Sequence, residues 1–175
     1  TPLKVAGTAV FGIDVRLPGM LYAVVERSPR FVGKVKSFDA SKALLVPGVK
    51  HVVRTERDIF GNMREGVAVV ATSTWAAIKG RRALIVEWDD TGIPEVSSAS
   101  LAAALKSSLA GKPLGFKSKG DVAAALGATP AVDVTYETPY QAHACMEPIN
   151  CTAHVTDTSA EIWGPVQAPD WNRGH

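Results

Sequence analysis

The sequence predicts an α+β fold, on three observations. Short apolar segments of strand character alternate with helical segments in the first half of the chain, and strand-like segments dominate its end. Hydrophobic residues make up 46% of the 175 residues, which is enough to bury the core of one good-sized domain or two small ones. No internal repeat is present.

Four strands are predicted in the first half because each is an apolar run bounded by turn residues: 20–25, 49–54, 67–71 and 84–88. Asp39 is placed to cap a helix over residues 40–46, which Pro47-Gly48 ends. Thr72 or Ser73 is placed to cap a second helix, between the last two of these strands. The resulting strand–helix–strand unit closes a first domain.

The second half begins with a helix over about residues 97–109. Residues 111–120 have the composition of a linker, and Asp121 is placed to cap a short helix. Three strands with period-two character are then predicted: 131–137, 150–155 and 160–163. This order indicates one complete domain followed by part of another.

The charge balance excludes some classes of partner. Nineteen basic and 17 acidic residues give a formal net charge of +2, whereas nucleic acid or an anionic membrane would require a concentrated basic patch. The longest apolar runs, 66–71 and 129–134, are far shorter than the ~20 residues of a membrane span, so we expect no transmembrane segment. The chain starts abruptly, without Met or a secretory signal, which suggests a piece of a longer protein.

Residues 140–150 hold the densest group of side chains capable of acid–base or ligand chemistry. His143 and Glu147 lie four residues apart beside a proline, so a proton-transfer pair and structural hydrogen bonds both remain open. A thiolate at Cys145, activated by His143, is a second possibility, but no oxyanion-hole motif accompanies it. Cys145 and Cys151 match no zinc or iron–sulfur spacing, and we expect two mostly buried thiols. The residues alone thus identify no catalytic residue and no metal ligand.

Spaced blocks along most of the chain resemble the large subunit of the molybdenum hydroxylases, the xanthine dehydrogenase and aldehyde oxidase class. Five of them look like the α/β hammerhead domain of that class: Gly12-Ile13-Asp14, Leu17–Ala23, Arg27-Ser28-Pro29, Asp39–Ala43 and Pro47-Gly48-Val49. Three segments resemble the beta subunit of isoquinoline 1-oxidoreductase in particular: Thr8–Asp14, Thr74–Ala77 and Ala142–Ala153. Within the last segment, Cys145 stands where the familiar pattern has Pro.

The resemblance implies a division into three parts. Residues 1–92 would form the α/β hammerhead domain, 93–128 a helical segment and linker, and 129–175 the opening strands of a molybdopterin-binding domain. Residues 163–169 resemble the family segment whose Gln approaches the metal, which makes Gln167 the candidate cofactor-binding residue. In the family this amide hydrogen-bonds an oxo ligand of molybdenum, a role that suits a neutral donor. A surface or core glutamine with no such role is the other interpretation.

The resemblance also implies cofactors and partners. The complete subunit would hold molybdopterin cytosine dinucleotide, work with a small [2Fe-2S] subunit and oxidise an N-heterocycle or an aldehyde. The family's Gly-rich cofactor segment and its late catalytic Glu are expected beyond His175, so we expect this chain alone to be inactive and to bind neither molybdenum nor iron. The alternative is a free-standing hammerhead interaction or assembly module with no redox role. The sequence leaves the compartment, periplasmic or cytoplasmic, open.

Overall fold

The structure is a computed structural model that describes residues 1–111, 114, 115, 117, 119–121, 124, 125, 127, 132 and 134–167. The chain divides into two compact units. The larger unit is Gly19–Ser118, and the smaller unit is Thr1–Pro18 together with Lys119–His175. In the described part of the chain, no helix combines the length and the apolarity that crossing a membrane requires.

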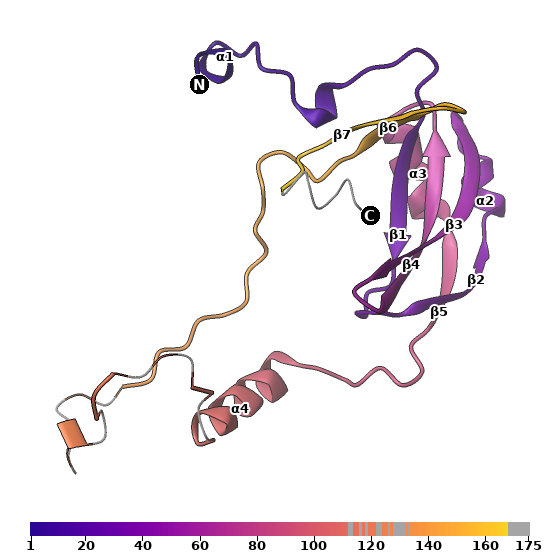
Figure 1. Cartoon of the computed structure of the whole chain (residues 1–175). Helices are drawn as coiled ribbons and strands as arrows, with labels where there is room; N and C mark the ends of the chain where they lie inside the picture. Colours follow the sequence, from indigo (N-terminus) through magenta and orange to yellow (C-terminus); the bar gives the residue numbers. More distant parts are fainter. Residues whose placement is uncertain are drawn as a thin grey trace. The chain divides into compact units, whose positions relative to one another are not determined.

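The larger unit is built on a three-stranded antiparallel sheet with a two-stranded sheet beside it (Figure 1). The three-stranded sheet has the order β1-β4-β3, with the strands β1 (Tyr22–Arg27), β4 (Asn62–Ala71) and β3 (Val49–Ile59). The second sheet pairs β2 (Lys34–Asp39) with β5 (Ile85–Asp89). Mixed helices and strands confirm the predicted α+β class.

The core of the larger unit lies between one face of the three-stranded sheet and helix α3 (Thr74–Ala83). Val67 and Val69 of the central strand β4 are fully buried. Gly80 lets the helix approach the sheet closely, because a Cβ there would lie 2.8 Å from Cγ2 of Val49 and from Cγ1 of Val69. Ser73 begins the helix, since its side chain accepts a hydrogen bond from Ala76 N.

Glu65 connects the two sheets. Its side chain is only 8% exposed. Its Oε2 accepts a hydrogen bond from Val35 N of β2 (2.9 Å) and one from an Arg54 guanidinium nitrogen of β3 (2.6 Å). A buried carboxylate is stable only when it is paired and hydrogen-bonded, and here a cation and a backbone amide provide both.

Two further helices belong to the larger unit. Helix α2 (Ser41–Leu44) is shorter than the predicted 40–46, although Asp39 does accept a hydrogen bond from Ser41 N as the cap prediction requires. Helix α4 (Ser98–Leu109) matches the prediction, and Ser97 and Ser100 form a reciprocal capping box at its start. No residue of α4 is buried.

The smaller unit contains helix α1 (Pro2–Val5), the 3₁₀ turn η1 (Gly12–Asp14) and an antiparallel hairpin of β6 (Thr152–Val155) and β7 (Ala160–Trp163). The hairpin turn is closed by hydrogen bonds between Thr156 and Ser159.

Several predicted strands need correction. Strand β3 continues to Ile59, five residues beyond the prediction, and β4 begins at Asn62 rather than at 67. Strand β2 was not predicted. Of the predicted strand 131–137, residues 132 and 134–137 are described and none is in a strand, while 131 and 133 lie outside the described residues. The strands that flank α3, β4 and β5, lie in different sheets, so the predicted strand–helix–strand unit is not a parallel pair.

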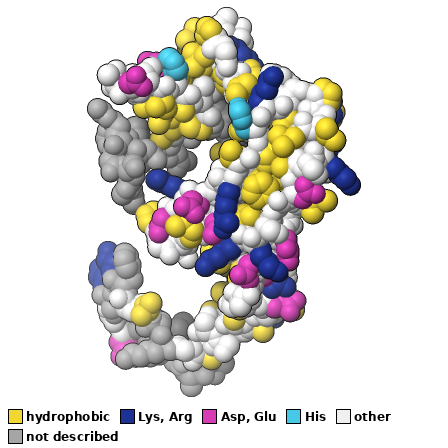
Figure 2. Space-filling view, turned by 90° about the vertical axis from the view of Figure 1, so that its right-hand side faces the viewer, with side chains coloured by type: hydrophobic (Ala, Val, Ile, Leu, Met, Phe, Trp, Pro, Cys, Tyr) yellow, Lys and Arg dark blue, Asp and Glu magenta, His cyan; other side chains and the backbone are white. Residues whose placement is uncertain are grey.

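Exposed apolar side chains are frequent among the described residues. Phe31, Phe60 and Leu45 are each at least 80% exposed. Figure 2 shows hydrophobic side chains gathered on one face of the molecule, with Lys and Arg side chains around them.

Candidate functional site

The candidate site lies in the smaller unit, where the turn η1 meets the chain on either side of the β6–β7 hairpin. The turn is fixed from within. Asp14 Oδ2 accepts a hydrogen bond from Phe11 N (3.0 Å), and the Arg16 guanidinium donates to the carbonyl oxygens of Ile13 (2.7 Å) and Val15 (2.8 Å). These contacts satisfy backbone groups that a single short turn leaves unpaired.

Glu147 joins this turn to the chain that precedes β6. Its Oε1 accepts hydrogen bonds from Ile13 N (3.3 Å) and from Asn150 Nδ2 (2.9 Å). The Asn150 amide also donates to the carbonyl of Pro148 (2.8 Å). Glu147 and Asn150 are half-buried. One carboxylate thus connects two segments that are 134 residues apart in sequence.

Two glycines allow these segments to touch. A Cβ at Gly12 would lie 2.7 Å from Asn150 Oδ1 and 3.0 Å from the Cα of Gly164, distances that a real Cβ does not tolerate without a shift of its neighbours. A Cβ at Gly164 would lie 3.0 Å from the carbonyl oxygen of Asn150. Asn150 Oδ1 is buried here and has no hydrogen-bond partner among the described residues. The contact is therefore specific for glycine at both positions.

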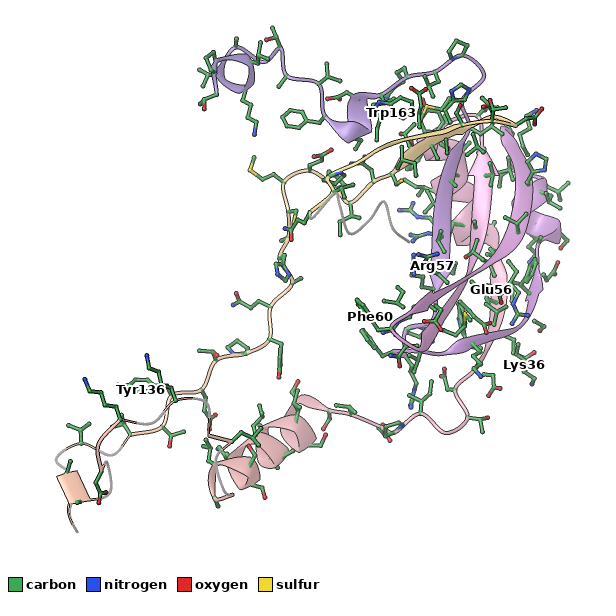
Figure 3. All side chains as sticks on the ribbon, viewed as in Figure 1. Lys36, Glu56, Arg57, Phe60, Tyr136 and Trp163 are labelled. Atoms are coloured by element: carbon green, nitrogen blue, oxygen red, sulfur yellow. The ribbon has the colours of Figure 1, made fainter. Side chains whose placement is uncertain are left out.

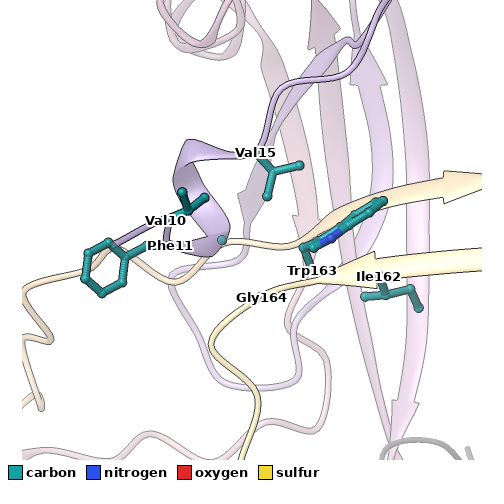
Figure 4. A pocket seen from close by; sticks show the side chains of 7 residues that line it. Val10, Phe11, Val15, Ile162, Trp163 and Gly164 are labelled. Atoms are coloured by element: carbon teal, nitrogen blue, oxygen red, sulfur yellow. The ribbon is translucent and has the colours of Figure 1, made fainter. Parts of the chain in front are cut away.

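A groove of about 310 Å³, lined by apolar side chains and by polar backbone atoms, opens beside this contact (Figure 4). Its lining has no ionisable side chain and consists of Val10, Phe11, Gly12, Val15, Ile162, Trp163 and Gly164. In the close-up, the Trp163 ring lies between Val15 and Ile162. The groove can take an apolar group, but it supplies no acid, base or nucleophile.

Gln167 lies four residues after the end of β7 and is exposed. The segment that carries it is restrained at its start, because Gly164 packs against Asn150 and the carbonyl of Gly164 accepts a hydrogen bond from Val166 N (2.9 Å). The segment that carries Gln167 thus begins at the Gly12–Asn150–Gly164 contact.

The polar cluster at residues 140–150 serves structure in this arrangement. The Glu147 carboxylate accepts hydrogen bonds from Ile13 N and Asn150 Nδ2, and in the described part of the chain it makes no hydrogen bond to His143. His143 and Cys145 are both exposed, and no hydrogen bond joins them within the described residues. Of the two interpretations left open for Glu147, structural hydrogen bonding is the one the geometry supports.

The expectation of buried thiols was wrong. Cys145 and Cys151 are both free and exposed. They flank a stretch with little packing, in which Met146 and Ile149 are also exposed, so no apolar neighbours cover them. Among the residues that the structure describes, no group of three or more His, Cys, Asp and Glu side chains is placed to hold a metal ion.

Sequence reasoning missed the roles of Gly12 and Asn150. Both lie in segments that were recognised only as family motifs, and the contact joins residues from opposite ends of the chain. A glycine beside a polar turn residue is too common a pattern to identify such a contact.

Two curated proteins match the sequence, and no family model does. The chain is 39% identical over 87 residues to the isoquinoline 1-oxidoreductase subunit beta of Brevundimonas diminuta, which covers 50% of this chain and 10% of that protein. It is 31% identical over 165 residues to a membrane-bound aldehyde dehydrogenase, named for pyrroloquinoline quinone, of Gluconacetobacter polyoxogenes; this match covers 92% of this chain and 21% of that protein. The chain thus spans between a tenth and about a fifth of the length of these relatives.

A crystal structure of a copper- and molybdenum-containing CO dehydrogenase matches 58% of this chain and 15% of its own, with 25% identity and a TM-score of 0.43. The sequence matches confirm the resemblance drawn from the motifs, and the chain is a relative of one segment of the molybdenum hydroxylase large subunits, among them the beta subunit of isoquinoline 1-oxidoreductase.

Proposed function

We propose that this chain forms a segment of the large, cofactor-binding subunit of an oxidoreductase that hydroxylates N-heterocycles of the isoquinoline type or oxidises aldehydes. The observation that carries the proposal is the match over 92% of the chain to a protein named as an aldehyde dehydrogenase, together with the 39% identity to a protein named as an isoquinoline oxidoreductase subunit. The substrate class follows from these two names.

Within this proposal, residues 1–92 correspond to an α/β hammerhead domain, 93–128 to a helical segment and linker, and 129–175 to the opening strands of a molybdopterin-binding domain. The two-sheet larger unit supports a domain within the first part, and the β6–β7 hairpin supports strands in the last part.

The residues present fit a role beside the cofactor rather than as its metal ligands. The described residues offer no cluster of metal-ligating side chains, whereas Gln167 offers an exposed amide on a segment whose start is restrained by Asn150 and Gly164. When bound, molybdopterin cytosine dinucleotide would supply the two-electron redox chemistry. Gln167 would donate a hydrogen bond to it from its NH2 group without adding charge.

Glu147 and Asn150 have a supporting task in this proposal. By tying the turn η1 to the chain before β6, they hold Gly164 and hence the segment that carries Gln167. Residues that orient a cofactor-binding side chain matter to a site nearly as much as the side chain itself. The remainder of the large subunit and a small [2Fe-2S] subunit would complete the enzyme.

Pyrroloquinoline quinone is the alternative cofactor, because one of the two relatives is named for it. A free-standing hammerhead module without any redox cofactor is the alternative from a different class. Both alternatives leave Gln167 without a role in turnover.

Replacement of Gln167 tests the proposal. In the complete subunit assembled with its iron–sulfur partner, Gln167→Ala removes one donor, and losing one preorganised hydrogen bond to developing charge costs about 2–4 kcal/mol, or roughly 30- to 1,000-fold in rate. Turnover is measured per molybdenum bound, with Gln141→Ala as the control. Equal normalised rates for Gln167→Ala and wild type would contradict the assignment, and a changed yield with normal turnover per metal would show a structural glutamine.

A further inference from the structure

The three-stranded sheet of the larger unit has one covered face and one open face. Helix α3 and strand β2 pack on the sheet from the same side: α3 contacts Val69 and Val49 through Gly80, and β2 reaches Glu65 through Val35. Because side chains alternate along a strand, the residues next to these in sequence point to the other side. Neither α3 nor β2 therefore covers the open face, where the Phe31 ring contacts Arg64.

The strand register identifies the residues of the open face. Opposite residues in an antiparallel pair share a face, and the pairs Val25↔Ala68 and Val53↔Ala68 mark the centre of this one. The full set is Ala23, Val25 and Arg27 of β1; Asn62, Arg64, Gly66, Ala68 and Val70 of β4; and His51, Val53, Thr55, Arg57 and Ile59 of β3. The middle of the face is thus aliphatic, and Val53 there is 45% exposed.

Charge is divided between the two faces by sign. Arg27, Arg57 and Arg64 all belong to the open face, at the end near the β3–β4 hairpin, and Figure 3 shows Arg57 and Phe60 on this hairpin. The acidic residues of the three strands all lie on the covered face: Glu26, Glu56, Asp58 and Glu65. The open face therefore carries three arginines and one histidine but no carboxylate.

Two of the three arginines repel each other across the strands. Arg57 and Arg64 are directly opposite in the register, and like charges in that arrangement destabilise a sheet. The Arg64 guanidinium lies 4.2 Å from the centroid of the Phe31 ring, a cation–π contact that holds it in place. No ion pair to Arg27, Arg57 or Arg64 occurs within the described residues, whereas Arg54 on the covered face is paired with Glu65. An anionic group from outside the larger unit would relieve the repulsion between Arg57 and Arg64.

We propose that the open face of the β1-β4-β3 sheet is a docking surface for an acidic polypeptide segment, whose apolar side chains cover Val25 and Val53, on either side of the buried Ala68, while its carboxylates pair with Arg27, Arg57 and Arg64. This inference does not rest on the proposed redox function. Arginine is enriched in protein–protein interfaces and in their binding hot spots relative to the rest of a protein surface.

Charge decides between the possible occupants. A second copy of the same face would bring arginines against arginines or against His51, because the face holds no carboxylate to receive them. Nucleic acid recognition uses aromatic stacking platforms or a long basic stripe, and this face is aliphatic at its centre. An acidic segment with one apolar side pairs with the arginines through its carboxylates and covers the aliphatic centre with its apolar side chains.

Two matched peptides test the proposal on the 175-residue chain. Each is a helical peptide of about 18 residues with one leucine face, flanked by glutamate in one peptide and by lysine in the other. Binding is followed by NMR shifts of backbone amides. The glutamate peptide is expected to bind and to shift β1, β3 and β4, and the lysine peptide is not. No binding of the glutamate peptide at about 1 mM, or shifts confined to other residues, would overturn the proposal.

Sequence variants distinguish a loss of peptide binding from a loss of folding stability. The triple variant Arg27→Gln, Arg57→Gln, Arg64→Gln is expected to weaken the binding of the glutamate peptide about tenfold or more. It is expected to melt close to wild type, because the loss of the Arg57–Arg64 repulsion offsets the loss of the cation–π contact between Arg64 and Phe31. Val53→Thr should weaken binding several-fold. The control Lys4→Gln, Lys42→Gln, Lys79→Gln removes the same charge from other exposed positions and should bind like wild type. Equal weakening by both triple variants, self-association of the chain, or tighter binding of a DNA duplex than of the peptide would each refute the acidic docking surface.

Discussion

Glu65 shows how a single side chain can hold two sheets together. Burial alone would raise its pKa, but the hydrogen bonds from Val35 N and Arg54, with the positive charges of Arg54 and Lys34, outweigh burial and hold the pKa of Glu65 below its usual value of 4.5. A carboxylate with a lowered pKa in the folded state stabilises that state above its unfolded pKa. This contribution is lost as the pH falls through about 4.5 and below.

We predict that Glu65→Gln lowers the free energy of unfolding by about 1–3 kcal/mol at neutral pH, since a charge-assisted pair is lost while Arg54 stays in place. Urea denaturation of wild type and variant measures the difference, which should shrink when the pH is lowered toward 4. Glu87→Gln is the matched control, because Glu87 also accepts hydrogen bonds across strands, from Lys36 and Ser37, but is exposed. Equal losses for the two variants would contradict a special role for Glu65.

Gly12 is the second residue whose identity the structure explains. Gly12→Ala places a Cβ against Asn150 Oδ1 and Gly164, and overpacking of this kind costs about 1–3 kcal/mol. We predict faster hydrogen exchange in β6 and β7 with unchanged exchange in β4. Gly115→Ala, at a position where a Cβ meets nothing within 4 Å, is expected to leave exchange unchanged. Normal exchange in the β6–β7 hairpin of Gly12→Ala would rule out the proposed close contact.

At the scale of elements, the sequence predicted those segments whose own residues specify them. The run Val67–Ala71 is apolar throughout and became the buried end of β4, and Ser97 with Ser100 specified the start of α4. Strand β2 was missed because Lys34–Asp39 is mostly polar, and its place depends on pairing with β5 and on the Glu65 hydrogen bond. Tertiary contacts of this kind leave no local signal.

The strands should also differ in stability. Strand β4 is paired on both sides and packs on α3, whereas β6 and β7 form an isolated two-stranded hairpin, which is marginally stable by itself. We predict that hydrogen exchange is slow for Val67–Ala71 and faster for Thr152–Trp163. Uniform protection of the two sets of amides would refute this difference.

At the scale of the whole molecule, the order of the sequence motifs gave more information about the family than any single residue did. The segments Thr8–Asp14, Thr74–Ala77 and Ala142–Ala153 indicated the beta subunit of isoquinoline 1-oxidoreductase, a protein that the sequence matches. The contact between Gly12, Asn150 and Gly164 was beyond sequence reasoning, because it joins the two ends of the chain and its evidence is steric. The role of Gln167 remains a prediction, supported by its exposed position after β7.

The most direct test of the central claim is the cofactor content of the protein made from the entire reading frame that contains this sequence, measured beside the 175-residue chain. The account predicts about one molybdenum per long chain after dialysis, with the pterin recovered from denatured protein, and no stoichiometric molybdenum in the short chain. A long chain that is folded and active but carries pyrroloquinoline quinone, or no redox cofactor at all, would contradict it.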